Sequence, residues 1–591
     1  GMHRVYNSAF MHMLKNEEND KYRDLITNTL EFEPEILKRY VNFMSNPDEE
    51  TAIRQFGTGD KYFGVCVLMS TLPGLPMFAH GQVEGYTEKY GMEYQRAYYN
   101  ELPQQWLVEK HQREIFPLLS KRYLFSEVEH FNFFDFQDDA GFLNENVMAY
   151  TNRFGIERAL VLFNNKYEEA SGRIINSAPK LQKGGDGTQT RELQLGEALG
   201  LNGGQGYYYS MKEHISGHEY LKSGRELHEQ GLHWHLNGFE YLIFWEFREI
   251  FDVTGIYERL HYNLAGQGVA SIEQARKELE LEQVYAAFEP LFLPDVIDPF
   301  IGSLQDPEIP MKDDPSLEPI TSRYRNFVSR VVSHYGLDAR EEKAAKSFFE
   351  SLQGVKATYR FVKDHEAVLA DKMQSRRSAD ADQVPLPGAQ GPFRESAMII
   401  MAFYAKEALK RLSENEDQQK ALQEALMLRF PLQKVLRSTG KTLEEIDRDV
   451  DLLDLLLANG SGVFDLRDAL LGGLLPKEKT GKVPLAFEKK LKLVAEMLDD
   501  LKMRRYIGAN LYEEAWYFSK EKFEELLSWL FSAAIFEYFS KGKEIDGFLS
   551  ADERTRLVRA DLFLLHTLME FSERAGYQLG ALKNKLEEAG E

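Results

Sequence analysis

The chain has 591 residues, of which 43% are hydrophobic and 28% are charged, and this ordinary balance excludes an intrinsically disordered chain. Its 71 Lys+Arg against 94 Asp+Glu give a formal net charge of −23. Such a charge argues against a general binder of nucleic acids or anionic membranes, because phosphate contacts need a basic surface. Cys66 is the only cysteine, so no internal disulfide can form, and a reducing, cytoplasmic location is favoured.

The sequence predicts no secretory leader and no membrane-spanning segment. Residues 1–20 lack the uninterrupted apolar stretch of a leader. The most apolar stretch, residues 62–79, is broken by Pro73, Gly74 and Pro76. We therefore expect a buried helix followed by a buried strand.

Residues 1–125 alternate short apolar runs with helical patterns. The pattern predicts strands at 4–14, 40–44 and 75–78, and helices at 20–30, 60–72, 107–124 and from Pro34 onward. Alternation of strand and helix is typical of parallel βαβ units in an α/β fold.

Residues 126–262 change to an alternation with a period of two. Strand-length segments lie at 131–136, 146–151, 159–163, 173–176, 207–211, 233–236 and 241–247. Many short strands separated by Gly, Asn and Asp turns indicate an antiparallel β-sandwich.

Residues 263–591 carry helical patterns. Apolar residues recur at spacings of 4, 3, 4 and 3, as on one helix face, at Phe487, Leu491, Val494, Leu498 and Leu501. We expect an all-α region here, with linkers near 304–319 and 379–392, where Pro, Asp and Gly accumulate. The chain as a whole is thus predicted to be multidomain: α/β, then β, then α.

Polar clusters follow two of the apolar runs in the first region. Asn46, Asp48, Glu49 and Glu50 follow the run at 40–44, and His80, Gln82 and Glu84 follow the run at 75–78. Because the carboxyl ends of parallel strands face the ligand crevice in α/β folds, these groups suit recognition of sugar hydroxyls. A structural interpretation stays open, since Ser-Asn-Pro-Asp-Glu-Glu is also a helix cap followed by an acidic first turn.

These segments resemble the C-terminal part of the catalytic barrel of the α-amylase family of glycoside hydrolases. YVNFMSNPD (40–48) is similar to the seventh barrel strand, which ends in Asn-His-Asp, and LPGLPMFAHGQVEG (72–85) to the eighth, with its Pro-Gly-x-Pro start. Residues 3–14 are similar to the sixth strand, and NVMAYTNRFGIERALVLFNNKYEEA to the start of the β-sandwich that follows the barrel. The resemblance covers roughly residues 1–260 and implies the distal part, about strands 6–8, of a (β/α)8 barrel.

The resemblance implies action on α-glucans or maltooligosaccharides, by hydrolysis or glycosyl transfer, with no cofactor. Asp48 would be the third catalytic carboxylate, which binds sugar hydroxyls and stabilises the transition state, with Asn46 as its motif partner. The further substrate-binding residues on the same face would be His80, Gln82 and Glu84. Pro47 stands where the family has a substrate-binding His, so one sugar contact is missing.

The resemblance leaves two catalytic groups unplaced. A retaining glycosidase needs a nucleophile and an acid/base about 5–5.5 Å apart. In this family both come from the fourth and fifth strands, whereas the resemblance begins at the sixth. We therefore expect a chain that is inactive alone, with its open barrel edge covered by another chain or by self-association. The alternative is a non-catalytic glucan-binding or protein-assembly module in which the helical region is the working part.

The remaining candidates have simpler interpretations, and no metal site is predicted. Metal ligation needs three or four converging ligands. We expect no such convergence among the histidines of the sandwich region, which are interpreted as ordinary structural residues: His214, His218, His228, His233 and His235. Cys66 is interpreted as a core thiol within a buried helix. The Gly-rich segment 200–207 lacks the Lys and Ser/Thr of a phosphate loop.

Overall fold

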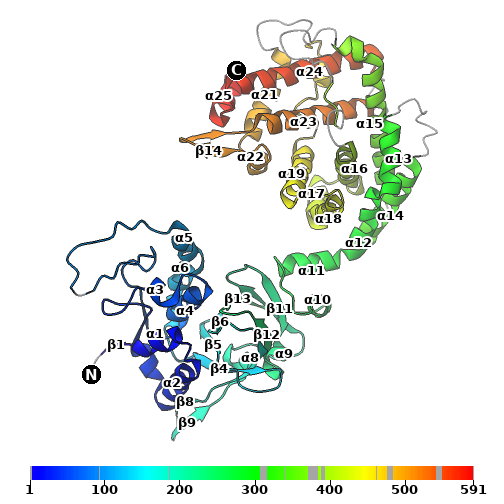
Figure 1. The fold of residues 1–591 in the computed structure, drawn as a ribbon. Coiled ribbons are helices and arrows are strands. Elements are labelled where there is room, and N and C mark those ends of the chain that lie inside the picture. Colours follow the sequence, from blue (N-terminus) through cyan, green and yellow to red (C-terminus); the bar gives the residue numbers. More distant parts are fainter. Residues whose placement is uncertain are drawn as a thin grey trace. The chain divides into compact units, whose positions relative to one another are not determined.

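The computed structural model divides the chain into two compact units, Gly1–Glu280 (the N-terminal unit) and Leu281–Glu591 (the C-terminal unit) (Figure 1). The structure describes residues 3–91, 93–184, 187–305, 316–338, 340–370, 384–387, 393–460, 462–475, 484–540 and 549–589. The linkers predicted near 304–319 and 379–392 lie largely outside these residues.

A three-stranded parallel sheet opens the N-terminal unit. Its order is β1-β2-β3, and Phe43 of β2 pairs with Met77 of β3. The strands are β1 (Val5–Tyr6), β2 (Tyr40–Phe43) and β3 (Leu75–Met77), and the helices are α1 (Ser8–Lys15), α2 (Asn19–Phe32), η1 (Pro34–Arg39), α3 (Ala52–Phe56) and α4 (Asp60–Thr71). The strands at 40–44 and 75–78 and the helices at 20–30 and 60–72 lie where the sequence predicted them.

Two elements predicted in this region are shorter than expected. The strand expected over 4–14 ends at Tyr6, because the Oδ1 of Asn7 accepts a hydrogen bond from the Phe10 N–H at 3.1 Å and caps α1. The helix expected over 107–124 is broken near Pro117, which has no N–H to donate to a continuous helix. Three helices replace it, α5 (Gln105–Glu114), α6 (Phe116–Ser120) and α7 (Arg122–Phe125).

The following region forms one eight-stranded antiparallel sheet, with strand order β11-β10-β13-β6-β5-β4-β7-β12. Its strands are β4 (Asn132–Asp138), β5 (Val147–Phe154), β6 (Glu157–Asn164), β7 (Ala170–Ser177), β10 (Tyr207–Glu213), β11 (Glu219–Ser223), β12 (Leu232–Leu236) and β13 (Tyr241–Phe251). Tyr220 on one edge strand and Trp234 on the opposite edge strand are in ring contact, with centroids 5.1 Å apart. The sheet therefore curls far enough for side chains of its two edge strands to touch across its interior, where the sequence predicted a sandwich of two sheets.

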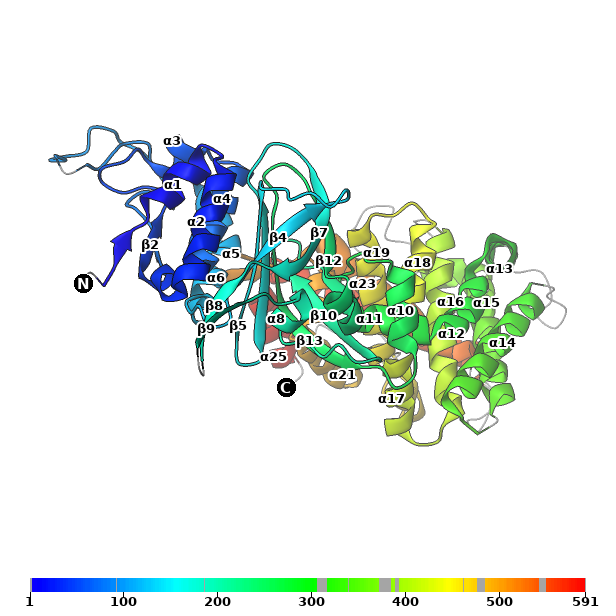
Figure 2. The ribbon, with the colours of Figure 1, turned by 90° about the horizontal axis from the view of Figure 1, so that it is seen from below.

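Alternating side chains along these strands serve two cores. Met148 and Val161 pack with α4 on one face, whereas Ala149 and Leu162 face the interior of the curl. At Gly64 a Cβ atom would lie 2.1 Å from the ring of Phe163, so α4 rests directly on β6. The parallel layer and the antiparallel sheet thus share one core (Figure 2). The unit is completed by the hairpin β8 (Lys180–Gly184) and β9 (Gly187–Arg191), and by α8 (Leu195–Ala198), α9 (Gly224–Glu229), α10 (Ile256–Leu264) and α11 (Ile272–Glu280).

The C-terminal unit is helical apart from the short hairpin β14 (Asn510–Tyr512) and β15 (Ala515–Tyr517), as far as the structure describes it. Its helices are α12 (Glu282–Phe288), η2 (Glu289–Phe292), α13 (Pro294–Gln305), α14 (Leu317–Tyr335), α15 (Glu341–Ala370), α16 (Phe393–Leu409), η5 (Lys410–Leu412), α17 (Glu416–Leu426), α18 (Arg429–Arg437), α19 (Leu443–Asn459), α20 (Arg467–Leu471), α21 (Leu485–Met497), α22 (Leu501–Tyr506), α23 (Lys520–Ser540), α24 (Ala551–Arg574) and α25 (Leu579–Ala589).

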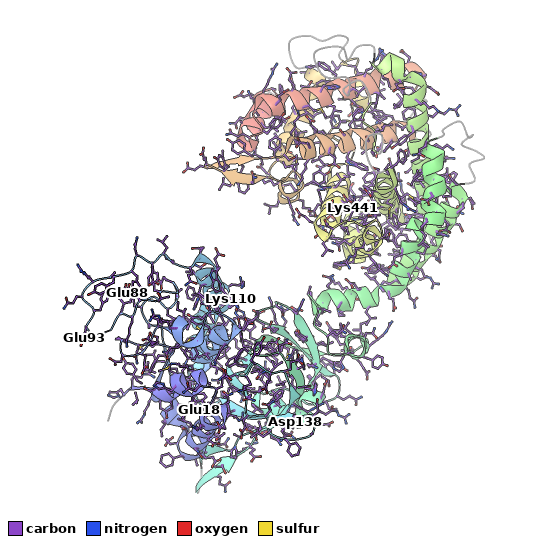
Figure 3. The ribbon with its side chains drawn as sticks, viewed as in Figure 1. Glu18, Glu88, Glu93, Lys110, Asp138 and Lys441 are labelled. Atoms are coloured by element: carbon purple, nitrogen blue, oxygen red, sulfur yellow. The ribbon has the colours of Figure 1, made fainter. Side chains whose placement is uncertain are left out.

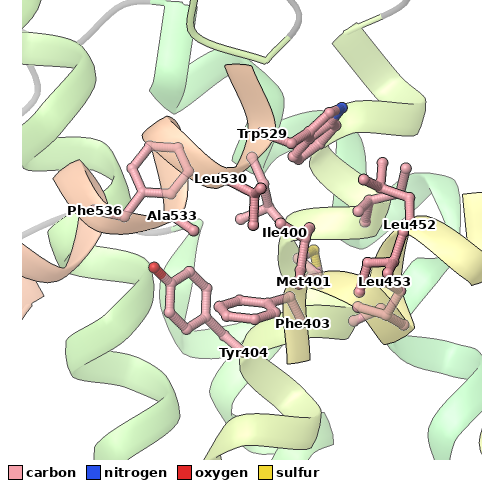
Figure 4. Close-up of a cluster of buried hydrophobic side chains, with 14 of the residues drawn as sticks. Ile400, Met401, Phe403, Tyr404, Leu452, Leu453, Trp529, Leu530, Ala533 and Phe536 are labelled. Atoms are coloured by element: carbon pink, nitrogen blue, oxygen red, sulfur yellow. The ribbon is translucent and has the colours of Figure 1, made fainter. Parts of the chain in front are cut away.

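Apolar faces of α16, α19 and α23 meet in the core of this unit, as Figure 4 shows for Ile400, Leu453 and Leu530. The face predicted from Phe487 onward is buried through Leu498. Leu501 is 77% exposed, which corrects its assignment to that face: the Asp500 carboxylate accepts N–H groups of a new helix and so ends the old one. Within the described ranges, no helix is both long and apolar enough to cross a membrane.

Candidate functional site

The turns that follow β2 and β3 lie side by side at one edge of the parallel sheet. The pairing of Phe43 with Met77 brings both strands to an end at the same level. Gln82 joins the two turns, because its Nε2 donates to the Met44 Sδ at 3.5 Å while its Oε1 accepts from the Ala79 N–H at 3.2 Å. The structure thus brings the two predicted polar clusters together.

Asn46 shapes the first turn. Its Oδ1 accepts the N–H groups of Asp48 at 2.9 Å and Glu49 at 3.0 Å. This is an Asx-type turn, which Asn favours because its side chain can replace a backbone acceptor. The helix-cap interpretation is therefore right about the capping bonds but wrong about the helix, which begins at Ala52 after Thr51.

Asp48 presents its carboxylate to solvent at the tip of this turn. Its backbone N–H and C=O are both held, the first by Asn46 and the second by the Lys89 Nζ at 2.7 Å. Within the described part of the chain, its carboxylate takes no hydrogen bond or ion pair. The neighbouring Glu49 lies 3.5 Å from the Nε2 of His12. An exposed carboxylate on a fixed backbone can accept hydroxyl hydrogen bonds from a ligand with little reorganisation.

The second turn places its predicted residues in different surroundings. Gln82 is only 3% exposed, so its side chain shapes the turn and does not reach solvent. His80 is exposed, and its ring lies 4.4 Å from that of Tyr90. Glu84 is half-buried, and its backbone C=O accepts the Gln104 N–H at 2.9 Å.

The buried side chains of Tyr62 and His111, which the sequence did not predict to be part of the site, support the second turn from the core side. The Tyr62 hydroxyl lies 2.9 Å from the Gln82 carbonyl oxygen and 3.2 Å from the Nε2 of His111. The His111 Nδ1 donates to the Leu107 carbonyl at 2.9 Å. Burial lowers the pKa of His111, while that bond and the charge of Glu84 act in the opposite direction. A lone histidine on an apolar helix face gives no sequence signal of such a contact.

Arg122 fixes the start of β3 and was also missed. Its guanidinium donates to the carbonyl oxygens of Ser70 at 2.8 Å and of Leu72 and Gly74, each at 2.6 Å. Burial lowers the pKa of Arg122 to about 10. One side chain thus satisfies three carbonyls where α4 turns through Pro73 into β3.

A long segment, residues 78–91 and 93–104, follows β3 without helix or strand in its described residues and is held by two carboxylates. Glu101 accepts the Thr87 N–H at 2.8 Å, the Thr87 hydroxyl at 2.5 Å and the Glu88 N–H at 3.0 Å. Burial opposes ionisation of Glu101, but these bonds outweigh it and lower its pKa. Glu88, labelled in Figure 3, is 7% exposed. Its carboxylate accepts the N–H groups of Tyr98 at 2.7 Å and Tyr99 at 3.0 Å.

The other residues considered for chemistry lie apart from this edge. His233 contacts Asp139 at 2.9 Å, and His228 contacts the Leu201 carbonyl at 2.9 Å. Cys66 is fully buried in α4, and burial raises the pKa of its thiol. In the ranges that the structure describes, no group of three His, Cys, Asp or Glu side chains is arranged to hold a metal ion.

No protein-family model matches this chain, and no curated protein matches it either. The resemblance to the α-amylase family therefore rests on the quoted segments alone.

Proposed function

We propose that the N-terminal unit binds α-linked glucans at the edge formed by the turns after β2 and β3, as the distal part of an α-amylase-type barrel. The observation that carries the proposal is the position of Asp48. Its carboxylate is exposed at the carboxyl end of a parallel strand, on a turn that Asn46 and Lys89 fix. Ligand crevices in parallel α/β folds lie at this end of the strands.

In this proposal Asp48 accepts hydrogen bonds from sugar hydroxyls, as the resemblance implies. Glu49, His80 and Glu84 line the same edge, whereas Gln82 shapes it from within. The nucleophile and the acid/base of a retaining glycosidase are not assigned to this edge. The chain is accordingly proposed to bind glucans without hydrolysing them by itself.

The test is calorimetric titration of the full chain with maltoheptaose, compared with the Asp48→Ala variant. A hydrogen bond to a charged group is worth about 1.5–3 kcal/mol, so the variant should bind about 10- to 100-fold more weakly. Glu168→Ala, an exposed carboxylate on the turn between β6 and β7, is the matched control and should bind like the wild type. Equal affinity of Asp48→Ala and wild type would reject the role of Asp48. Glucan hydrolysis by the chain that Asp48→Asn abolishes would reject the non-catalytic part of the proposal.

A second candidate function is assembly through β1, an edge strand of the parallel sheet. Val5 is 40% exposed and Tyr6 is 60% exposed, and edge strands present backbone groups that another strand can pair with. Light scattering over a range of concentrations tests this candidate. A mass that rises with concentration, and that Tyr6→Lys returns to the monomer value, would support assembly. A strictly monomeric particle would exclude self-association.

A further inference from the structure

Exposed aromatic side chains gather on the segment between β3 and α5. They are Tyr94 (38% exposed), Tyr98 (71%), Tyr99 (52%) and, at the start of α5, Trp106 (49%). Folded proteins seldom expose several large aromatic side chains together unless a ligand or partner covers them. Long loops without regular structure are also most often functional.

The segment is fixed in position before any ligand arrives. Glu88 binds the N–H groups of Tyr98 and Tyr99, and Glu101 binds Thr87 and Glu88. Since the carboxylates already hold this backbone, binding does not have to pay the full entropy of ordering it. Two exposed tyrosines are therefore displayed on a preformed support.

Tyr94 is connected to the turn after β3 through a row of ring contacts. The rings of His80 and Tyr90 lie 4.4 Å apart, and those of Tyr90 and Tyr94 also lie 4.4 Å apart. This row of three rings runs from the turn after β3 into the segment. Lys89, beside Tyr90 in the chain, holds the Asp48 carbonyl at 2.7 Å. The turn that carries Asp48 and the segment that carries the aromatic rings are therefore in direct contact.

The chemistry of this surface suits a neutral polyhydroxylated chain. The side chains of Glu84, Glu93 and Asp48 offer acceptors to hydroxyl hydrogens, and the guanidinium of Arg96, 5.6 Å from the centroid of the Tyr98 ring, offers donors. Tyrosine rings offer flat apolar faces to the C–H faces of pyranose rings, and each hydroxyl can add a hydrogen bond. A surface that binds an oligosaccharide needs both features along the length of the sugar chain.

We propose that Tyr94, Tyr98 and Tyr99 form an extended binding surface for the α-glucan chain whose end lies at Asp48. The inference rests on the proposed function and assigns to these residues the sugar units beyond the one at Asp48. Residues 85–91 and 93–104 act as a fixed aromatic support for the glucan.

The test is calorimetric titration of the full chain with maltoheptaose and with the shorter maltotriose. Tyr98→Ala and Tyr99→Ala should each weaken maltoheptaose binding by roughly tenfold, and should weaken maltotriose binding less. Tyr262→Ala removes a tyrosine that is 83% exposed on α10 and should leave both affinities unchanged. Circular dichroism should report the same fold for all three variants.

The outcomes separate this inference from the proposed function. Weaker binding in Asp48→Ala with unchanged binding in both tyrosine variants would overturn the aromatic surface and leave the Asp48 site standing. Weaker binding in the tyrosine variants with unchanged binding in Asp48→Ala would support the surface and reject the role of Asp48. A concentration-dependent dimer that Tyr98→Ala abolishes, with unchanged sugar affinity, would make the tyrosines a protein interface and overturn the inference. No binding of either sugar by the wild type would overturn both.

Discussion

Replacing Asp561 by asparagine is expected to remove a pH dependence from the stability of the C-terminal unit. Asp561 on α24 is fully buried, and its Oδ2 lies 2.6 Å from the Tyr538 hydroxyl. That hydroxyl also lies 3.0 Å from the Phe464 carbonyl oxygen and accepts the Leu466 N–H at 3.1 Å. One hydroxyl hydrogen cannot serve both oxygens. A proton on the Oδ2 removes this conflict, because Asp561 then donates to Tyr538 and Tyr538 donates to Phe464. The Oδ1 of Asp561 is buried without a hydrogen-bond partner among the described residues, which also disfavours a charged carboxylate.

The surroundings of the carboxyl favour this protonated form. Burial raises the pKa of Asp561 well above its usual range, against the effect of the Tyr538 hydrogen bond. The charge of Asp465 also raises this pKa, whereas Lys490 and Arg467 lower it. Between the unfolded pKa of about 3.9 and the higher folded pKa, the folded chain therefore binds up to one proton more than the unfolded chain.

The sign and size of the pH effect follow from this difference. The stabilising contribution is complete below the unfolded pKa and is lost as the pH rises through the folded pKa. In between, the free energy of unfolding falls by about 1.4 kcal/mol per pH unit on account of this group. Asparagine does not titrate, and its amide can donate to Tyr538 as the protonated acid does. The stability of Asp561→Asn relative to wild type should therefore rise by about 1.4 kcal/mol per pH unit from the unfolded pKa of about 3.9 up to the folded pKa of Asp561, and should level off above it.

Urea unfolding of the full chain, followed by pulsed hydrogen exchange of peptides from α23 and α24, measures this difference. Glu570→Gln is the matched control, since it removes an exposed carboxylate of α24 that pairs with Arg574. Its stability should stay within about 0.5 kcal/mol of wild type at each pH. Parallel pH profiles for Asp561→Asn and wild type would refute a protonated Asp561 in the folded chain.

Three further predictions concern the N-terminal unit, each measured by urea unfolding followed with exchange of its peptides. Arg122→Met should lower the free energy of unfolding by about 3 kcal/mol, because three buried carbonyls lose their donor; an unchanged midpoint would mean that water replaces the guanidinium. Gly64→Ala should lower the free energy of unfolding by about 1–3 kcal/mol, because the added methyl group collides with β6. Gly59→Ala is the control: a Cβ there meets nothing within 4 Å, so the loss should be less than about 1 kcal/mol. Equal losses in the two variants would contradict the close packing of α4 on β6. Tyr241→Phe should lower the free energy of unfolding by about 1–3 kcal/mol, because the buried Glu114 carboxylate loses a hydrogen-bond donor at 2.6 Å. An unchanged free energy would show that another donor replaces the Tyr241 hydroxyl.

Local sequence patterns predicted much of the secondary structure, because each depends on neighbouring residues. The apolar run at 40–44 and the turn at Pro73 mark β2 and the approach to β3. Asn7 shows the limit, since one capping side chain turns an apolar stretch from strand to helix. The pairing of eight strands into one curled sheet depends on partners such as Tyr241 and Phe163, which lie far apart in sequence. No local pattern contains that information.

The candidate site likewise contains residues whose positions could be predicted from local sequence and residues whose positions could not. Polar residues after two parallel strands were sufficient to predict that Asp48 and His80 lie at one edge. The buried position of Gln82 could not be predicted, because it depends on a contact with Met44 at the end of the other strand. The role of Glu88 in fixing two distant tyrosines likewise depends on the path of a long irregular segment.

A crystal structure of the chain with maltotetraose most directly tests whether this edge is a glucan site. We expect a glucose unit with a hydroxyl within hydrogen-bond distance of the Asp48 carboxylate, and further units along Tyr94 and Tyr98. Sugar bound elsewhere on the chain, with that carboxylate left in solvent, would contradict it.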